Sequence, residues 1–552
     1  MIRKGRIPST DIEILEKLCN KSDDTYTHHP NLEIKKSNKG YGIYVTDGPI
    51  KCGERLFHFK ETHLIQPSGK IKDFIDSGKF SSVIGLIFTA MHELFVKQHK
   101  SPFFAYLNSQ IPPTIAHLWN EKEKQQLKGT SLLVDEKNVG LLDLDKIYEK
   151  DVLRLLHELG TDLFPTQIIT KENFFTAFQW VYSRASQDIN TVRNYDNYHH
   201  QDNNNNNGGG GSSNSSSSIS SSAIIHTDNT KPSIGYCAFI PIFDLINHTA
   251  NVNKKNASLV NLKLKENNAF EVYSEKNLKP GDELYVSYGN YGSSILIRQY
   301  GFYESSIYSK VIITKQEVVQ SVKESYCDTF EAADRKEMYD MLDEKLAEAK
   351  LNSLFQFFVL EKSELVVNND DNNGAWEPPK DLLTFLQVLI MEDDEWEEWE
   401  KAGCIELGTE YIDFEIAPII FSALIKLLEI CSHRYNSFTP ELSASIRNDD
   451  ITAMAKCLIQ EEKNIFSLAK EKVSLMIKNF ALKFAEESED EEDVDDIVYD
   501  ESNDDAIATN EFEKKRRRAI NNEEGKSGDT RGDEQDTTTI SKMSSSNKKQ
   551  KK

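Results

Sequence analysis

The 552-residue sequence contains no Cys-x-x-Cys pair, no long apolar run and no excess of basic residues. Its seven cysteines are scattered, which argues against a structural zinc cluster and favours free thiols in a reducing compartment. No stretch reaches the apolar length of a membrane span, and the first residues lack the core of a signal peptide. The formal net charge of -24 argues against a general nucleic-acid binder, which needs a basic face. We therefore expect a soluble intracellular protein without a membrane span, direct nucleic-acid contact or a metal.

Part of the chain is too polar to fold into a compact core. The hydrophobic fraction is 38% and the mean hydropathy is -0.54, which are low values for a single globule. Residues 188–232 consist largely of Asn, Gly and Ser, so we expect a disordered insert without a catalytic role. The pair His199 and His200 lies within this insert, and we assign it no metal because no third candidate ligand is nearby.

Residues 486–552 form a strongly charged tail. The tail opens with a nearly unbroken run of carboxylates, which must be solvated. Two basic clusters follow, Lys514–Arg518 and Lys548–Lys552. We expect this tail to be disordered and its basic clusters to favour nuclear import, with the cytoplasm as the alternative location.

Hydrophobic periodicity divides the remaining chain into four parts. Residues 1–30 are polar, with one short helical pattern. Apolar and polar residues then alternate over Leu32–Phe59, as in paired strands. Helical spacing of apolar residues dominates from about residue 70 to residue 185, and it returns over residues 305–485. Strands and helices are therefore both expected, in separate stretches of the chain.

The stretch Gly235–Glu304 has the features of a binding site. Asn247 and His248 are adjacent polar residues that follow an apolar segment. A Pro-Gly-Asp turn precedes a short run of aromatic and β-branched residues, which predicts a strand. Tyr288 and Tyr300 each precede a glycine, where the missing side chain lets a ligand or another backbone come close.

In their order and spacing, Asn247-His248, Tyr288-Gly289 and Tyr300-Gly301-Phe302 resemble the catalytic half of a SET-domain protein-lysine methyltransferase. The resemblance is to the class typified by the Rubisco large-subunit methyltransferase, whose members methylate non-histone proteins, and it covers roughly residues 31–485. It implies an α+β protein. A β-rich, pseudoknotted SET domain would occupy residues 31–304, with a helical insert at about 70–185, and an all-helical, substrate-binding C-terminal domain would occupy residues 305–485.

The same resemblance implies S-adenosyl-L-methionine as the cofactor and a lysine-bearing, non-histone protein as the substrate. Tyr288 would be the catalytic residue that orients the acceptor amine. Tyr300 and Phe302 would line the substrate channel. The expected cofactor-binding residues are Gly40, Tyr41, Gly42, Arg184, Asp244, Asn247, His248, Tyr288 and Tyr300.

One part of the motif departs from the pattern of the relatives. They often carry Ser-Asn at the fourth and fifth positions after the catalytic tyrosine, where this chain has Gly292 and Ser293. That asparagine usually helps to shape the substrate pocket. Substrate choice and the number of methyl groups added are therefore left open.

Each residue also has an ordinary structural interpretation. Taken singly, Tyr288 is a common strand tyrosine, His248 a core histidine and Asn247 a helix cap. Two rival functions stay open beside lysine methylation: a protein-histidine N-methyltransferase, and a catalytically silent binding module or scaffold. No oligomeric state is assigned.

Overall fold

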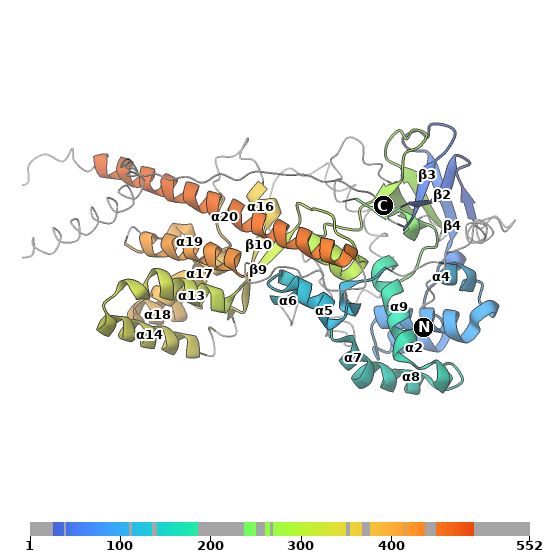
Figure 1. Cartoon of the computed structure of the whole chain (residues 1–552), viewed down its shortest axis with the longest axis horizontal. Helices are drawn as coiled ribbons and strands as arrows, with labels where there is room; N and C mark the ends of the chain where they lie inside the picture. The colour runs from blue at the N-terminus through green and yellow to red at the C-terminus, as the bar shows by residue number, and fades with distance from the viewer. Residues whose placement is uncertain are drawn as a thin grey trace, which may run out of the picture. The chain divides into compact units, whose positions relative to one another are not determined.

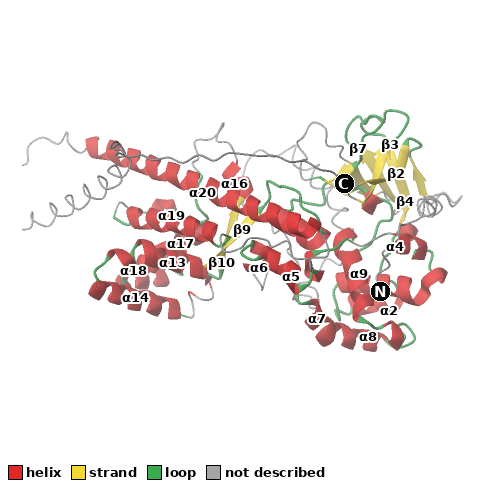
Figure 2. Cartoon of the chain, viewed as in Figure 1, coloured by secondary structure: helices red, strands yellow, loops and turns green. Residues whose placement is uncertain are grey.

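A computed structural model of the chain describes residues 26–37, 40–109, 113–134, 141–185, 237–249, 260–264, 269–348, 351, 354–366, 376–412, 415–435 and 449–490. These parts combine helices with short strands (Figures 1 and 2). None of the described helices combines the length and apolarity that crossing a membrane requires. The low-complexity tract at 188–232 and the basic tail clusters, for which disorder and nuclear import are expected, lie outside the described residues. By internal contacts the chain divides into Met1–Ala481 and Leu482–Lys552, and the elements below belong to the first unit except for the end of the last helix.

The strands of the N-terminal half form small sheets. Four antiparallel strands pair in the order β1-β4-β7-β6, and β2 pairs antiparallel with β3. Phe59 of β4 faces Phe270 of β7 in register, and their rings stack with centroids 5.7 Å apart. Such cross-strand aromatic pairs stabilise a sheet and fix its register. The strands are β1 (Tyr26–His28), β2 (Leu32–Ser37), β3 (Gly40–Val45), β4 (Arg55–Lys60), β6 (Val260–Leu264) and β7 (Ala269–Ser274).

Helices occupy most of the described chain from Gly69 to Arg184. Helix α3 begins where the Ser81 side chain accepts a hydrogen bond from the backbone of Ile84, and α9 begins where Thr170 caps Asn173 in the same way. Helix α8 ends at Gly160, whose φ of +94 suits glycine. The helices are α2 (Gly69–Asp76), α3 (Ser82–Met91), α4 (Phe104–Ser109), α5 (Glu121–Lys124), α6 (Ser131–Val134), α7 (Leu144–Ile147), α8 (Leu153–Leu159) and α9 (Lys171–Arg184).

The C-terminal region is helical, as expected, but it also contains a two-stranded antiparallel ribbon. Strand β9 (Lys310–Thr314) pairs with β10 (Phe357–Glu361). The expectation of an all-helical domain missed this ribbon, although both segments are rich in the β-branched and aromatic residues that strands favour. The helices are α13 (Lys315–Ser325), α14 (Ala332–Ala347), α16 (Lys362–Val366), α17 (Lys380–Ile390), α18 (Asp393–Lys401), α19 (Ala417–His433) and α20 (Asp449–Asp490).

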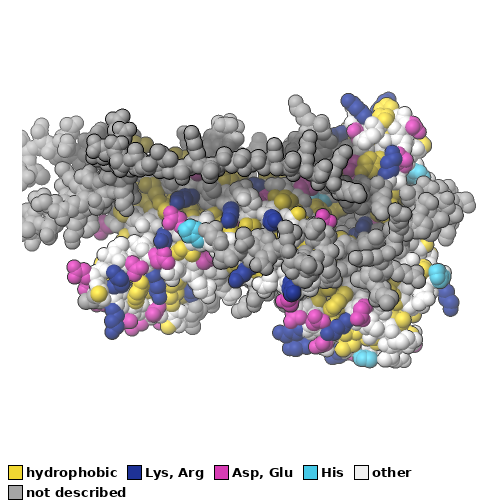
Figure 3. All heavy atoms as spheres, viewed as in Figure 1, with side chains coloured by type: hydrophobic (Ala, Val, Ile, Leu, Met, Phe, Trp, Pro, Cys, Tyr) yellow, Lys and Arg dark blue, Asp and Glu magenta, His cyan; other side chains and the backbone are white. Residues whose placement is uncertain are grey.

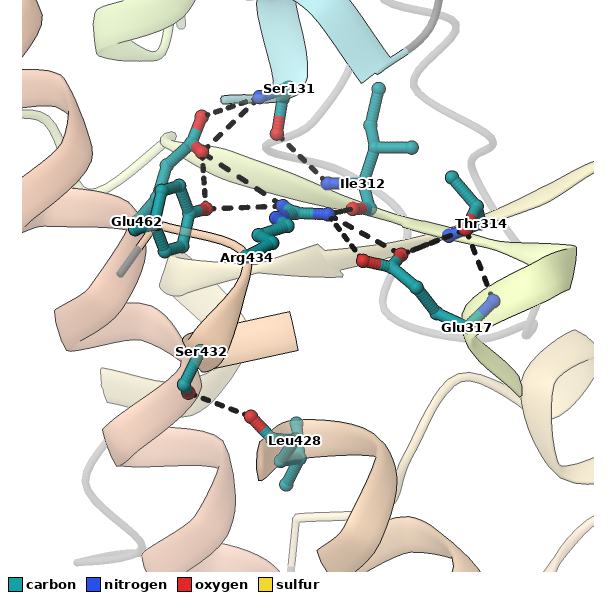
Figure 4. Close-up of polar contacts among 9 residues, drawn as sticks. Ser131, Ile312, Thr314, Glu317, Leu428, Ser432, Arg434 and Glu462 are labelled. Atoms are coloured by element: carbon teal, nitrogen blue, oxygen red, sulfur yellow. Dashed lines mark hydrogen bonds and ion pairs between the residues drawn. The ribbon is translucent and has the colours of Figure 1, made fainter. Parts of the chain in front are cut away.

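A buried arginine joins the ribbon to the helices around it (Figure 4). Arg434, just after α19, donates from Nη1 to the backbone carbonyl of Ile312 at 2.9 Å and to Glu317 Oε1 at 3.2 Å. Its Nη2 donates to the Tyr435 hydroxyl at 3.1 Å. One guanidinium therefore satisfies partners on β9, on α13 and on its own segment, as the planar fork of arginine allows.

Glu462 of α20 continues the same network toward the helical insert (Figure 4). Its Oε2 accepts a 2.6 Å hydrogen bond from the Tyr435 hydroxyl and lies 4.0 Å from Arg434 Nη2. Its Oε1 accepts a 3.1 Å hydrogen bond from the backbone nitrogen of Ser131 in α6. Burial raises the pKa of Glu462, while Arg434 and the hydrogen bonds act in the opposite direction. The carboxylate thus connects the insert to the C-terminal helices.

Charged side chains on the surface, unlike Arg434 and Glu462, are exposed to water. On the face in Figure 3, the described acidic and basic side chains are interspersed. Pairs such as Lys401 with Glu397, 3.0 Å apart and exposed, are screened by water. The buried network of Arg434 and Glu462 is therefore the better target for a stability test.

We predict that Arg434→Met lowers the free energy of unfolding by about 3–5 kcal/mol, because it leaves the buried carboxylate of Glu462 and the mostly buried carboxylate of Glu317 without their cation. Equilibrium urea unfolding of the full chain measures the loss. Lys401→Met, which breaks only an exposed pair, is the control and should leave the unfolding midpoint unchanged. Equal midpoints for Arg434→Met and the parent chain would contradict a stabilising role of the network.

Candidate active site

A parallel pair of two-residue strands places the Asn-His motif beside the predicted catalytic tyrosine. In this pair, Asn247 of β5 (Asn247–His248) faces Tyr285 of β8 (Tyr285–Val286). The backbone nitrogen of Thr249 donates to the carbonyl of Val286 at 3.2 Å and extends the pairing. Two segments that are distant in sequence are thereby fixed side by side, with Tyr288 two residues beyond β8.

Tyr288 is held at its backbone and at its hydroxyl by the same segment. Its backbone nitrogen donates to His248 Nδ1 at 3.0 Å, and its hydroxyl donates to the carbonyl of Ile246 at 3.0 Å. Burial raises the pKa of Tyr288 to about 12, although the nearby charge of Arg184 acts to lower it. The phenol is therefore neutral near pH 7, with an oxygen fixed in position.

An aromatic cluster surrounds this tyrosine. The Tyr288 ring centroid lies 5.0 Å from that of His248 and 4.8 Å from that of Tyr300. Phe302 lies 6.0 Å from His248 and 6.2 Å from Tyr300. Tyr291 lies 6.0 Å from Tyr300 and extends the cluster. The structure thus brings together four residues that the motifs predicted, and their faces are suited to a cation or a methylated amine.

A glycine allows Tyr300 and Phe302 to lie on the same cluster. Gly301 ends the turn η9 (Leu296–Tyr300) in the left-handed conformation, with φ of +72. A Cβ atom at this position would lie 2.8 Å from the carbonyl oxygen of Thr114. Both the backbone conformation and the close approach therefore require glycine.

Asn247 connects the cluster to the Gly-x-Gly segment of β3. Its Nδ2 donates to the carbonyl of Tyr41 at 3.3 Å and to Glu283 Oε1 at 2.6 Å. A Cβ atom at Gly42 would lie 2.5 Å from Glu283 Oε1 and 3.1 Å from Asn247 Nδ2, so a larger residue would push both side chains away. Gly40, the first residue of β3, pairs with Ser37 at the turn end of the β2–β3 hairpin.

Arg184 and Asp244 meet beside the tyrosine. Arg184 Nη1 donates to the backbone carbonyl of Asp244 at 3.1 Å, and its guanidinium lies 5.3 Å from the centre of the Trp180 ring. The hydroxyl of Tyr106 donates to Asp244 Oδ1. The other carboxyl oxygen, Oδ2, is buried and makes no hydrogen bond with the described residues. Burial raises the pKa of Asp244 to about 6, against the opposing effects of Arg184 and of the Tyr106 bond.

Three residues of this site were missed by the sequence analysis: Glu283, Tyr106 and Tyr291. Glu283 had a weak signal in the sequence, because it lies two residues before Tyr285 and an extended backbone places the two side chains on one side. In the structure it accepts a 2.6 Å hydrogen bond from the Tyr285 hydroxyl. Tyr106 had no signal in the sequence, since it lies far from Asp244 along the chain.

The ten residues predicted for the site lie on the segments that meet around Tyr288, and the chemical roles assigned to them stay predictions. Among the described residues, no group of three His, Cys, Asp or Glu is arranged to hold a metal ion.

Comparisons with known proteins agree with this geometry. Residues 40–289 match the family model of the SET domain. Ribosomal lysine N-methyltransferase 4 of Saccharomyces cerevisiae is 23% identical over 384 residues, which cover 66% of this chain and 68% of that protein. The solved structure of the SET domain of LSMT bound to lysine and AdoHcy has a TM-score of 0.52 and 16% identity, covering 85% of this chain and 92% of that one. Rubisco LSMT bound to AdoMet has a TM-score of 0.50 and 16% identity, covering 84% and 92%. The expected α+β fold with a SET domain is confirmed.

The raised pKa of Asp244 predicts a pH-dependent stability. Because the folded pKa of about 6 lies above the ordinary 3.8, the favourable contribution is present at low pH and is lost as the pH rises through about 6. In Asp244→Asn the side chain is permanently neutral, so we expect the melting temperature of the variant, relative to the parent, to rise from about pH 4 to about pH 7. Thermal unfolding across this range measures the difference. A difference that does not change with pH would show that Asp244 titrates normally.

Proposed function

This chain carries a SET domain, and on that premise we propose that it is an S-adenosylmethionine-dependent protein-lysine N-methyltransferase. The observation that carries the proposal is the aromatic cluster of His248, Tyr288, Tyr300 and Phe302 around one fixed hydroxyl. An amine that enters such a cluster loses water on all sides. Its methylated forms are stabilised by the ring faces.

The residues next to this cluster fit the cofactor chemically. Arg184 supplies a guanidinium for a carboxylate, and its Nε is buried without a hydrogen bond to the described residues. Asp244 Oδ2 is an acceptor that is likewise buried without a hydrogen bond to the described residues. Asn247, His248 and the backbone beside Gly42 would make the remaining contacts. When bound, the cofactor supplies an electrophilic methyl group on a positively charged sulfur.

The chain itself must bring the acceptor lysine into its neutral form and align it. A lysine amine has a pKa near 10.4 in water, so it is charged at neutral pH. Desolvation between Tyr288, Tyr300 and Phe302 would lower that pKa and expose the nitrogen lone pair. The lysine would release its proton to solvent before it reacts, and its nitrogen lone pair would then face the methyl group that the bound cofactor supplies.

Tyr288 acts in this reaction as a fixed neutral group. Its raised pKa makes it a poor base at neutral pH. The hydroxyl donates to Ile246, which leaves the oxygen lone pairs to orient the amine and to contact the methyl hydrogens. Alignment of this kind accounts for much of the rate that an enzyme gains in a group transfer.

We infer a ribosomal protein as the substrate, because the curated relative is named a ribosomal lysine N-methyltransferase. Ribosomal proteins are rich in lysine, and the net charge of -24 on this chain favours encounter with such partners. The basic tail clusters support a nuclear location, where newly made ribosomal proteins would be accessible. Protein-histidine methylation is the second candidate, since the cluster would also accept an imidazole ring.

The proposed function predicts that one variant loses cofactor binding and that another loses only the rate of methyl transfer. Asn247→Ala removes the contacts to Tyr41 and Glu283 and should abolish cofactor binding, as measured by calorimetry with S-adenosylmethionine. Tyr288→Phe should bind the cofactor but transfer label from S-adenosylmethionine to washed yeast ribosomes about 100-fold more slowly. The controls are Asn464→Ala and Tyr411→Phe, which alter exposed residues of α20 and of the C-terminal region.

Mass spectrometry of the labelled protein then separates lysine from histidine. A methylated lysine that disappears in Asn247→Ala supports the proposal. A methylated histidine moves the assignment to the second candidate. A parent chain that binds no cofactor and transfers no label would instead be a silent binding module.

A further inference from the structure

One carboxylate of α20 holds both ends of the segment that carries Tyr300 and Phe302. This channel segment is Ser293–Ser306 and includes the short helix α12 (Ser293–Ile295) and the turn η9. At its start, the hydroxyl of Ser293 donates to Glu461. At its end, the Ser305 hydroxyl donates to Glu461 at 3.0 Å and the Ser306 backbone nitrogen at 3.3 Å. Glu461 therefore joins the two ends of the segment, beside a direct 2.7 Å contact between the Ser293 hydroxyl and the backbone carbonyl of Glu304.

A cation from another element completes this arrangement. Lys362, the first residue of α16, lies with its Nζ 2.8 Å from Glu461 Oε1, and the two side chains are 17% and 4% exposed. The same Nζ donates to the Ser305 hydroxyl at 3.3 Å. A carboxylate that is buried without a cation destabilises the fold. Lys362 compensates the negative charge of Glu461 at this buried position.

The two residues that depart from the motif lie at this junction. A Cβ atom at Gly292 would lie 2.7 Å from the carbonyl oxygen of Tyr308, so glycine allows the chain to pack closely there. Ser293 is fully buried, and besides Glu461 it contacts the Ser309 hydroxyl at 3.0 Å. Gly292 and Ser293, which replace the Ser-Asn pair of the relatives, therefore both pack against the C-terminal region.

From these contacts we propose that Glu461 is a positioning residue of the methyl transfer, and this inference rests on the proposed function. By fixing both ends of the channel segment, Glu461 sets where Tyr300 and Phe302 stand relative to Tyr288. The width of the channel then decides how well the acceptor amine is aligned and how many methyl groups it can carry. The C-terminal region acts on the reaction through this carboxylate.

The test compares two neighbouring glutamates in the full-length chain. Glu461→Gln keeps the shape but removes the charge that binds Lys362 and the channel segment. Glu462→Gln is the matched control, because Glu462 lies next to it on α20, is equally buried, and bonds Ser131 and Tyr435 instead. Both variants remove one buried charge from the same helix, so a purely structural effect would be similar in the two.

We expect Glu461→Gln to lower kcat for transfer from S-adenosylmethionine to washed yeast ribosomes by about tenfold or more, because small misalignments are costly in group transfer. The ratio of mono-, di- and trimethylated product should also change. The affinity for S-adenosylhomocysteine, measured by calorimetry, should stay as in the parent chain. Glu462→Gln should leave kcat and the product ratio unchanged, whatever it does to the melting temperature.

Ser305→Ala provides a second variant that does not disturb the core, since Ser305 is exposed. It removes one of the bonds to Glu461 and should change kcat in the same direction by a smaller factor. Equal kcat values for Glu461→Gln, Ser305→Ala and Glu462→Gln would overturn the positioning role alone. A parent chain that transfers no methyl group would overturn the proposed function, and the inference with it.

Discussion

The parallel pairing of β5 with β8 is the constraint on which the site depends. It is only two residues long on each side, yet it brings Ile246 and His248 to Tyr288 and lets them hold that residue at both ends. Without it, the Asn-His segment and the tyrosine would be separate loops. The aromatic cluster, the contact of Asn247 with β3 and the position of Asp244 all follow from the same pairing. A short pair suffices because two hydrogen bonds of Tyr288, to His248 Nδ1 and to the carbonyl of Ile246, join the same two segments.

Burial around Tyr288 determines the protonation states of the groups in the site. Withdrawal from water raises the pKa values of Tyr288 and Asp244, and the positive charge of Arg184 only partly opposes this effect. The acceptor amine would meet the same environment, in which its neutral form is favoured. One physical cause thus keeps the tyrosine protonated and would deprotonate the lysine. Arg184 remains the fixed cation, stacked on Trp180 and tied to the backbone of Asp244.

The local motifs could be predicted from the sequence, whereas the distant partners could not. Asn247, Tyr288 and Tyr300 stand beside glycines or in short fixed patterns, so their proximity followed from the family resemblance. Glu461 and Tyr106 reach their partners across more than a hundred residues, and ordinary helical positions give no sign of such contacts. The ribbon β9–β10 was missed for another reason. Its flanks have strong helical periodicity, and two five-residue strands are short beside that signal.

Glu461 and Glu462 are adjacent on α20, and that adjacency explains how one helix serves two regions. Successive residues of a helix point about 100° apart, so one carboxylate reaches the channel segment and the other reaches the insert. Each has a cation from a different element, Lys362 for the first and Arg434 for the second. A shift of α20 by one residue would place Lys463 beside Arg434 or Gln460 beside Lys362, so that one of the two cations would lose its carboxylate. The two ion pairs therefore fix the register of this long helix, which its repeating apolar pattern alone would leave ambiguous, and Tyr300 and Phe302 take their positions from that register.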